Sequence, residues 1–167
     1  LVLSDLISEV VKKQSFEAKK HGHKLSFHQL GDIPPVFIAR DRLEQILTNV
    51  LSNAIKYTPD GGKIEIFAKK LYNNAYIKVK DNGIGIPAKD LDRIFERFYR
   101  VDKARSRDLG GTGLGLAIAK EIIQAYGGDI SIESVQNEGT EGSITLPIGN
   151  TVASEAAEKI EKTADSC

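Results

Sequence analysis

The feature that most constrains the fold is an apolar stripe of helical period over residues 41–57, followed at once by two segments of period two. The stripe recurs at i, i+3 and i+4, through Leu43, Ile46, Leu47, Val50, Leu51, Ala54 and Ile55. At about 100° per residue these side chains share one broad face, which must be covered. Residues 63–71 and 75–81 alternate apolar and polar side chains and predict two strands joined by a turn.

The remaining segments extend this mixture of helices and strands. Further helices are expected over 3–21, 88–96, and from 112 or 113 to 126. Further extended segments are expected over 25–29, 36–39, 129–135 and 142–148. Ser4 and Asp41 are the expected N-caps of the first two long helices. The order predicts an α/β (α+β) sandwich, in which three main helices cover one face of a mixed sheet of about five strands.

Composition limits the class of protein. The length of 167 residues suits one domain, and 41% hydrophobic with 28% charged residues is typical of a globular chain. Lys plus Arg and Asp plus Glu both count 23, so no basic excess indicates nucleic-acid binding. No apolar run approaches the roughly 18–20 residues that span a bilayer, so we expect no membrane contact by this chain. Cys167 is the single cysteine, which excludes an internal disulfide, and the lack of methionine indicates a fragment of a longer protein.

Three polar residues share a second face of the helix expected over 41–57. Asn49, Asn53 and Lys56 lie within about 60° of one another around the helix axis. Asparagine is a mediocre helix former, and a lone one would be read as part of a solvated face. Two amides beside a lysine fit an oxygen ligand for Mg²⁺ next to a positive charge for phosphate.

The segment "DNGIGIP" (81–87) follows the second strand. Asp81 ends that strand, where a buried carboxylate is costly unless a donor satisfies it. Gly83 and Gly85 let the backbone bend closely around a ligand, and Pro87 suits the start of the next helix. A simple turn needs one glycine and no aspartate, so this segment predicts one wall of a binding site.

The segment "GGTGLGL" (110–116) places Gly110, Gly111, Gly113 and Gly115 just ahead of a helix. Bare backbone N–H groups at a helix start bind anions, and the helix dipole reinforces them. The pattern is neither of the common phosphate loops. It predicts a phosphate contact, with a flexible hinge as the alternative.

A basic run, "RIFERFYRVDKARSRD" (93–108), lies between the two glycine-rich segments. It holds six cations, which are Arg93, Arg97, Arg100, Lys103, Arg105 and Arg107. Such a cluster can neutralise a triphosphate. The interleaved Glu96, Asp102 and Asp108 suit an ordinary solvated surface equally well, so both readings stay open. We expect residues 100–115 to be mobile.

In this order and spacing, "NVLSNAIKYT" (49–58), "DNGIGIP", "FERFYR" (95–100) and "GGTGLGL" resemble the motifs of the catalytic ATP-binding domain of bacterial sensor histidine kinases. "EGTEGSITLPI" (138–148) resembles the closing segment of that domain. The basic run looks most like that of the cell-wall- and phosphate-responsive kinases of Gram-positive bacteria. The resemblance implies a Bergerat-type ATP-binding fold over residues 1–149, and it leaves 150–167 as a flexible C-terminal tail.

The resemblance also implies a site for Mg-ATP. Asn53 would coordinate Mg²⁺ with help from Asn49, and Lys56 would contact phosphate. Asp81 would accept a hydrogen bond from the adenine amino group, and residues 97–111 would form a lid over the triphosphate. The other expected nucleotide contacts are Tyr57, Gly83, Gly85, Ile86, Arg97, Arg100, Lys103, Gly110, Gly111, Thr112, Gly113, Leu114, Gly115, Leu116 and Thr140.

For the intact protein, the resemblance implies a cytoplasmic domain of a membrane-anchored sensor in two-component signalling. Its partners would be a histidine-bearing dimerisation domain of the same protein, which accepts the γ-phosphoryl group, and a downstream response regulator. The acceptor lies in a motif such as H-E-L-R-T-P, and none of His21, His23 or His28 has that context. These three histidines are expected at the surface, and the chain is expected to hold only the ATP-binding half of the kinase.

Two alternatives share the same fold. ATP-hydrolysing relatives place a glutamate, as general base for water, one helical turn before the metal-binding asparagine. Here that position holds Asn49, whose amide cannot accept a proton in this way. A module that senses nucleotide without transferring phosphate remains the second alternative.

Overall fold

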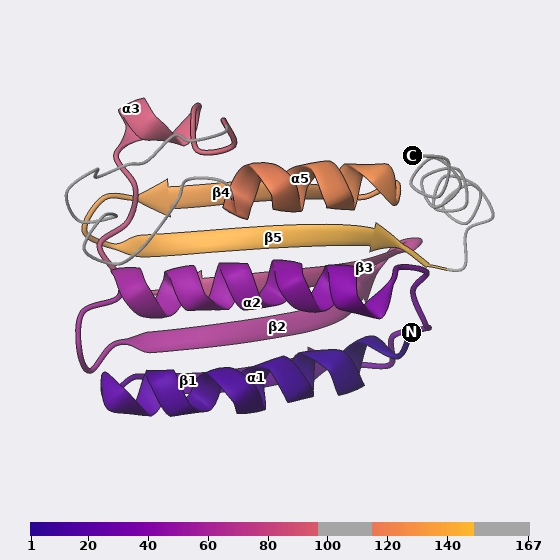
Figure 1. The fold of residues 1–167 in the computed structure, drawn as a ribbon, viewed down its shortest axis with the longest axis horizontal. Coiled ribbons are helices and arrows are strands. Elements are labelled where there is room, and N and C mark those ends of the chain that lie inside the picture. The colour runs from indigo at the N-terminus through magenta and orange to yellow at the C-terminus, as the bar shows by residue number, and fades with distance from the viewer. Residues whose placement is uncertain (97–114, 149–167) are drawn as a thin grey trace.

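The computed structural model describes residues 1–96 and 115–148, which form one mixed sheet with helices on one face (Figure 1). The strands lie in the order β1-β2-β3-β5-β4. Their bounds are β1 Lys24–Leu30, β2 Lys63–Leu71, β3 Asn74–Asp81, β4 Asp129–Val135 and β5 Gly139–Pro147. β1 runs parallel to β2, and the other neighbours are antiparallel. The predicted mixed sheet is confirmed.

Three main helices cover the sheet, as expected. They are α1 (Leu3–Lys20), α2 (Arg40–Tyr57) and α5 (Gly115–Ala125), and they lie side by side on one face (Figure 1). A short helix, α3, spans Ala88–Leu91. No helix within residues 1–96 and 115–148 combines the length and apolar character needed to cross a membrane.

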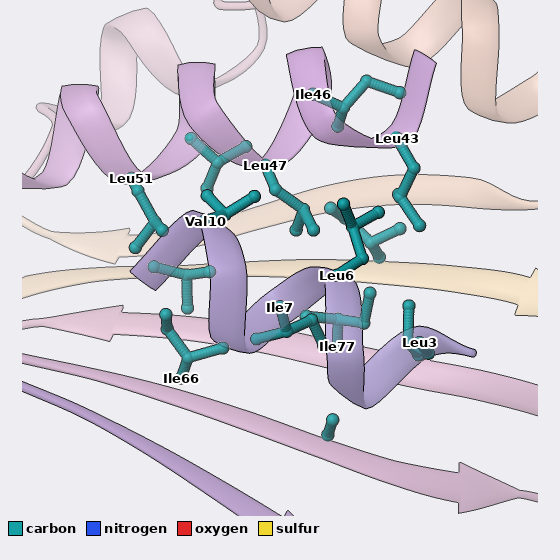
Figure 2. Close-up of a cluster of buried hydrophobic side chains, with 14 of the residues drawn as sticks. Leu3, Leu6, Ile7, Val10, Leu43, Ile46, Leu47, Leu51, Ile66 and Ile77 are labelled. Atoms are coloured by element: carbon teal, nitrogen blue, oxygen red, sulfur yellow. The ribbon is translucent and has the colours of Figure 1, made fainter. Parts of the chain in front are cut away.

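The core lies between the helices and the inner face of the sheet. Every member of the predicted apolar stripe on α2 is buried. Figure 2 shows Leu6 of α1, Leu47 of α2 and Ile77 of β3 within one cluster of buried side chains. Burying one such side chain contributes about 1.5–3 kcal/mol. This packing sets the rotation of α2 about its axis and leaves Asn49 and Asn53 half-buried at its margin.

The structure corrects several predicted boundaries. Residues 36–39 form no strand, because within them only Val36 pairs, in an isolated bridge to Ile148. Of the helix expected over 88–96, only α3 is helical, and tighter turns continue to residue 96. β5 begins at Gly139, three residues before the predicted start, because Gly139 and the two residues after it already pair with the end of β4.

Both predicted helix caps are wrong. Val2 and Ala39 occupy the N-cap positions of α1 and α2, and neither makes a side-chain cap. Ser4 and Asp41 lie inside the first turns. A carboxylate there still interacts favourably with the positive end of the helix dipole.

The expectation of three surface histidines is wrong for His23, which is buried. Its Nε2 donates to the carbonyl oxygens of Thr58, at 2.9 Å, and Pro59, at 3.2 Å. These carbonyls follow the end of α2, so the imidazole joins the α1–β1 connection to the segment after α2. The C-terminal turn of α1 at Gly22 directs the chain inward at this point. His21 and His28 are exposed, as expected.

Candidate functional site

The predicted site residues that the structure describes gather at one end of the sheet, at the left in Figure 1. α2 brings Asn49 and Asn53 toward this end, and β3 finishes there at Asp81. β5 starts beside Asp81, where Thr140 pairs with it, and α5 starts at Gly115. Segments far apart in the sequence therefore converge on one location.

Asp81 is the best-defined polar group of this site. Its Oδ1 accepts hydrogen bonds from the backbone N–H of Gly83, at 2.9 Å, and of Thr140, at 3.3 Å. Partial burial raises the pKa of the Asp81 carboxyl, and these two donors oppose that rise. Both bonds reach the same oxygen, and no residue in 1–96 or 115–148 donates a hydrogen bond to Oδ2. The carboxylate therefore offers Oδ2 as an acceptor to a ligand.

The first glycine segment is held against the end of α2. The N–H of Ile84 donates to the carbonyl of Tyr57 over 3.1 Å. A Cβ added at Gly83 would lie 2.5 Å from that same carbonyl and 2.9 Å from Thr58 Oγ1. Only glycine permits this approach, because real Cβ atoms do not come so close to backbone. Gly83 thus lets the loop that follows Asp81 pass directly against the end of α2.

A serine that the sequence reasoning missed connects the loop to the far strands. Ser134 Oγ accepts from the N–H of Ile86 at 2.7 Å, donates to the carbonyl of Gly139 at 2.9 Å, and lies 2.8 Å from Thr140 Oγ1. Ser134 pairs with Thr140 across β4 and β5. Gly85 lies beside this junction, against the carbonyl of Val135. Only the strand register reveals the role of Ser134, and the sequence alone does not give that register.

Gly139 brings the start of β5 close to Asp81. Its φ is +137°, in a region that side chains disfavour, and an added Cβ would lie 2.1 Å from the carbonyl oxygen of Asp81. The backbone of β5 therefore passes tightly against the residue that carries the acceptor. Gly139 is a second residue that the sequence reasoning did not assign to the site.

The start of α5 lies against the asparagine face of α2. A Cβ added at Gly115 would lie 3.5 Å from Asn49 Nδ2. Lys120, further along α5, places its Nζ 4.4 Å from the centroid of the Phe95 ring. Gly115 thus lies beside α2, and Phe95 lies beside α5. Lys56 is exposed, and Tyr57 and Leu116 are half-buried.

The donor chemistry of α2 fits a magnesium ion that arrives with its ligand. Within the described residues, no group of three or more His, Cys, Asp or Glu could hold a metal ion. The oxygen donors at the expected position are the side-chain amides of Asn49 and Asn53. Mg²⁺ binds through few protein oxygens when phosphates and water complete its octahedron. Two amide oxygens suit that arrangement.

Several predicted contacts lie outside the described residues and stay predictions. They are Arg97, Arg100, Lys103, Gly110, Gly111, Thr112, Gly113 and Leu114. The expected lid over 97–111, almost all of the expected mobile stretch over 100–115, and the tail over 150–167 lie there too.

Comparison with curated proteins identifies close relatives. The chain is 51% identical over 135 residues to the sensor histidine kinase WalK of Bacillus subtilis, which covers 79% of this chain and 22% of that protein. It is 53% identical over 109 residues to the sensor protein kinase WalK of Staphylococcus aureus, covering 64% of this chain and 26% of that protein. The chain therefore spans about a quarter of the length of these relatives. The predicted resemblance to Gram-positive sensor kinases is confirmed.

Solved structures share the fold. The catalytic domain of histidine kinase ThkA, in a nucleotide-free form, has a TM-score of 0.77 and 30% identity, covering 88% of this chain and 93% of that one. Full-length ShkA in complex with AMPPNP has a TM-score of 0.77 and 28% identity, covering 88% and 30%. ThkA in complex with the response regulator TrrA has a TM-score of 0.73 and 28% identity, covering 88% and 40%.

A family profile agrees with these relatives. The profile described as "Histidine kinase-, DNA gyrase B-, and HSP90-like ATPase" matches residues 38–150, more than half of the chain. Its match runs from the segment before α2 to the end of β5, and so spans the convergence of α2, β3, β5 and α5 described above. The chain therefore belongs to the histidine kinase-, DNA gyrase B- and HSP90-like ATPase family, within its histidine kinase catalytic domains.

Proposed function

We propose that this domain binds Mg-ATP at the Asp81 end of the sheet and, in the intact protein, supplies the γ-phosphoryl group to a histidine on a dimerisation domain. The observation that carries the proposal is the geometry of Asp81. Its Oδ1 is held by two backbone donors, and Oδ2 has no donor among the described residues. The exocyclic amine of adenine is a donor that matches Oδ2, whereas guanine would present an acceptor at the same place.

The phosphate end of the nucleotide would lie along α2 and the start of α5. Asn53, with Asn49, would hold Mg²⁺, which when bound neutralises charge on the phosphate oxygens. Lys56, exposed at the end of α2, adds a positive charge nearby. The N-terminus of α5 adds backbone N–H donors. Arg97, Arg100 and Lys103 are proposed to add contacts from the lid. Catalysis of phosphoryl transfer is mostly positioning and charge neutralisation, which these groups supply.

The position expected for a water-activating base holds an amide in this chain. Asn49 holds the position where ATP-hydrolysing relatives carry glutamate, and its amide cannot take the proton of an attacking water. His23 is buried and donates to two carbonyls. We therefore expect bound ATP to persist until an acceptor histidine is presented. The relatives named as sensor histidine kinases support this, and the ThkA–TrrA complex supports a response regulator as the downstream partner. A membrane-anchored sensor, with this domain in the cytoplasm, is the proposed setting.

A mixing assay tests the proposal. The domain is incubated with ATP labelled on its γ-phosphate, alone and with a separate dimerisation segment that bears the acceptor histidine, and the products are resolved by size. Label should appear on the added segment alone, and slowly, because the tether that raises effective concentration is missing. A segment whose acceptor histidine is replaced by glutamine is the control. Label on this domain, or rapid phosphate release without the segment, would contradict the proposal.

A further inference from the structure

The N-terminus and the β2–β3 turn lie at the end of the sheet opposite the end of β3, at the right in Figure 1, and five residues in or near the segments that end there have exposed apolar side chains. We call them the exit patch, which consists of Val2, Leu30, Phe37, Leu71 and Tyr72. Tyr72 is 87% exposed and Phe37 is 46% exposed. Val2 precedes α1, while Leu30 and Leu71 end β1 and β2. Exposed apolar patches mark sites of interaction.

The chain leaves the sheet through the middle of the exit patch. Ile148 forms an antiparallel bridge with Val36, the neighbour of Phe37. The N–H of Ile148 donates to the carbonyl of Asn73, the neighbour of Tyr72, at 2.9 Å. Paired segments lie about 5 Å apart, so Phe37 and Tyr72 flank the exit on its two sides. Ile148, the last described residue of the chain, therefore lies between two residues whose aromatic rings are exposed.

The sequence after the exit has the pattern of an amphipathic helix. At about 100° per residue, the apolar side chains of residues 152–164 fall within an arc of about 140°. They are Val152, Ala153, Ala156, Ala157, Ile160 and Ala164. The charged residues fall on the opposite side, and they are Glu155, Glu158, Lys159, Glu161 and Lys162. Glu155 and Glu158 each precede a lysine by four residues, which is the favourable order for helical ion pairs.

We propose that residues 152–164 form a helix that covers the exit patch, with Val152 and Ile160 packed against Phe37 and Tyr72. A helix of this length is marginal alone in water and needs an apolar surface to be stable. At 1.5 Å per residue it would be about 20 Å long, enough to cover both rings. Residues 149–151 span at most about 10 Å, which keeps the helix beside its exit. The proposal departs from the sequence expectation of a flexible tail.

Paramagnetic broadening in the full chain tests the placement. Cys167 is the single cysteine, so Cys167→Ser with Glu158→Cys allows one nitroxide label in the middle of the polar face. The label should broaden amide signals of residues 36–38 and 71–73, and their intensity should return when the nitroxide is reduced. Signals around Asp81, at the opposite end of the sheet, should keep their intensity.

Matched substitutions distinguish a helix that packs on the exit patch from a flexible tail that is near the patch only because the chain leaves the sheet there. Ile160→Asp, on the apolar face, should abolish most of the broadening at residues 36–38 and 71–73. Glu161→Gln, on the polar face of the same segment, should leave it unchanged. Phe37→Ser with Tyr72→Ser should act like Ile160→Asp, and unchanged signals near Asp81 would show that the variant remains folded.

Two outcomes would overturn the proposal. In the first, the folded labelled protein shows no more broadening at the exit patch than the Ile160→Asp variant. In the second, isotope-labelled protein without nitroxide is mixed with nitroxide-labelled protein that carries no isotope label, so only broadening between two molecules can be observed. The exit patch is then broadened in this mixture and not within a single labelled molecule. That result would assign the patch to a second copy of the chain.

Discussion

Asp81 and Thr140 face each other on neighbouring strands, and the backbone N–H of Thr140 donates to Asp81 Oδ1 over 3.3 Å. The proposed acceptor for the nucleotide base is thereby oriented by the sheet as well as by its own loop. Groups held by regular elements keep their geometry better than groups on loops alone. Recognition of the base should then need little rearrangement of β3 or β5.

Base specificity should depend on Asp81. The carboxylate accepts from the adenine amine, but it would face the O6 acceptor of guanine without a donor between them. An unpaired buried charge is costly, so GTP should bind at least tenfold more weakly than ATP, about 1.4 kcal/mol. Calorimetric titration with both nucleotides in the presence of Mg²⁺ measures the difference. Equal affinities would argue against this role of Asp81.

The same carboxylate should reduce stability at neutral pH. Burial raises the pKa of Asp81, so the folded chain retains this proton to a higher pH than the unfolded chain does. The stability from this group is complete below the ordinary pKa of aspartate, and it is lost as pH rises through the raised pKa. Asp81→Asn does not titrate, and its Oδ1 can still accept from Gly83 and Thr140.

Thermal melts over a range of pH check this expectation. Asp81→Asn should melt at a higher temperature than the parent at neutral pH, and the difference should shrink toward acid. The variant should also bind ATP more weakly, because its amide presents a donor where Oδ2 presented an acceptor. A parent chain that melts higher than the variant at neutral pH would disprove the stability argument and leave the binding argument intact.

The metal ligand can be tested on α2. Asn53→Ala should weaken Mg-ATP binding by tenfold or more, about 1.4 kcal/mol, because an oxygen ligand of the ion is lost. Affinity for ATP measured in a chelator should change much less. Gln45→Ala removes an exposed amide from the same helix and serves as the matched control. If a folded Asn53→Ala chain keeps its full affinity for Mg-ATP, Asn53 is not the ligand.

The proposed lid makes a prediction for hydrogen exchange. Residues 97–111 combine charge and glycine with few apolar anchors, so their amides should exchange quickly in the free protein. Mg-ATP should slow that exchange, while amides of β2 and β3 should be unaffected. Full protection of residues 97–111 before nucleotide is added would contradict the lid.

The elements that could be predicted from the sequence are those whose pattern lies within a short stretch of neighbouring residues. The stripe of α2 is a local pattern of helical period, and the alternation along β2 and β3 is equally local, so all three elements were placed almost to the residue. Asp81 could be proposed as a site residue from the sequence because a carboxylate beside two glycines is a local pattern too, and its role in binding stays a prediction.

Features that depend on contacts between residues far apart in the sequence could not be predicted from it. Ser134 joins the site only through the pairing of β4 with β5. His23 is buried because two carbonyls after α2 lie within reach of its Nε2, and those residues are more than thirty positions away. The cap expected at Asp41 failed because the N-cap is Ala39, two residues earlier than the local pattern indicated.

The close passage of Gly139 behind Asp81 bears on resistance to inhibitors. A compound that competes for Oδ2 would be evaded most simply by a bulkier residue nearby, yet a side chain at Gly139 would collide with the backbone that carries Asp81. A side chain at Gly83 would likewise collide with backbone, at the carbonyl oxygen of Tyr57. In the proposed site, a substitution at either position would disturb the backbone around Asp81 and so weaken nucleotide binding together with inhibitor binding. This wall would therefore offer an inhibitor a target with few viable substitutions.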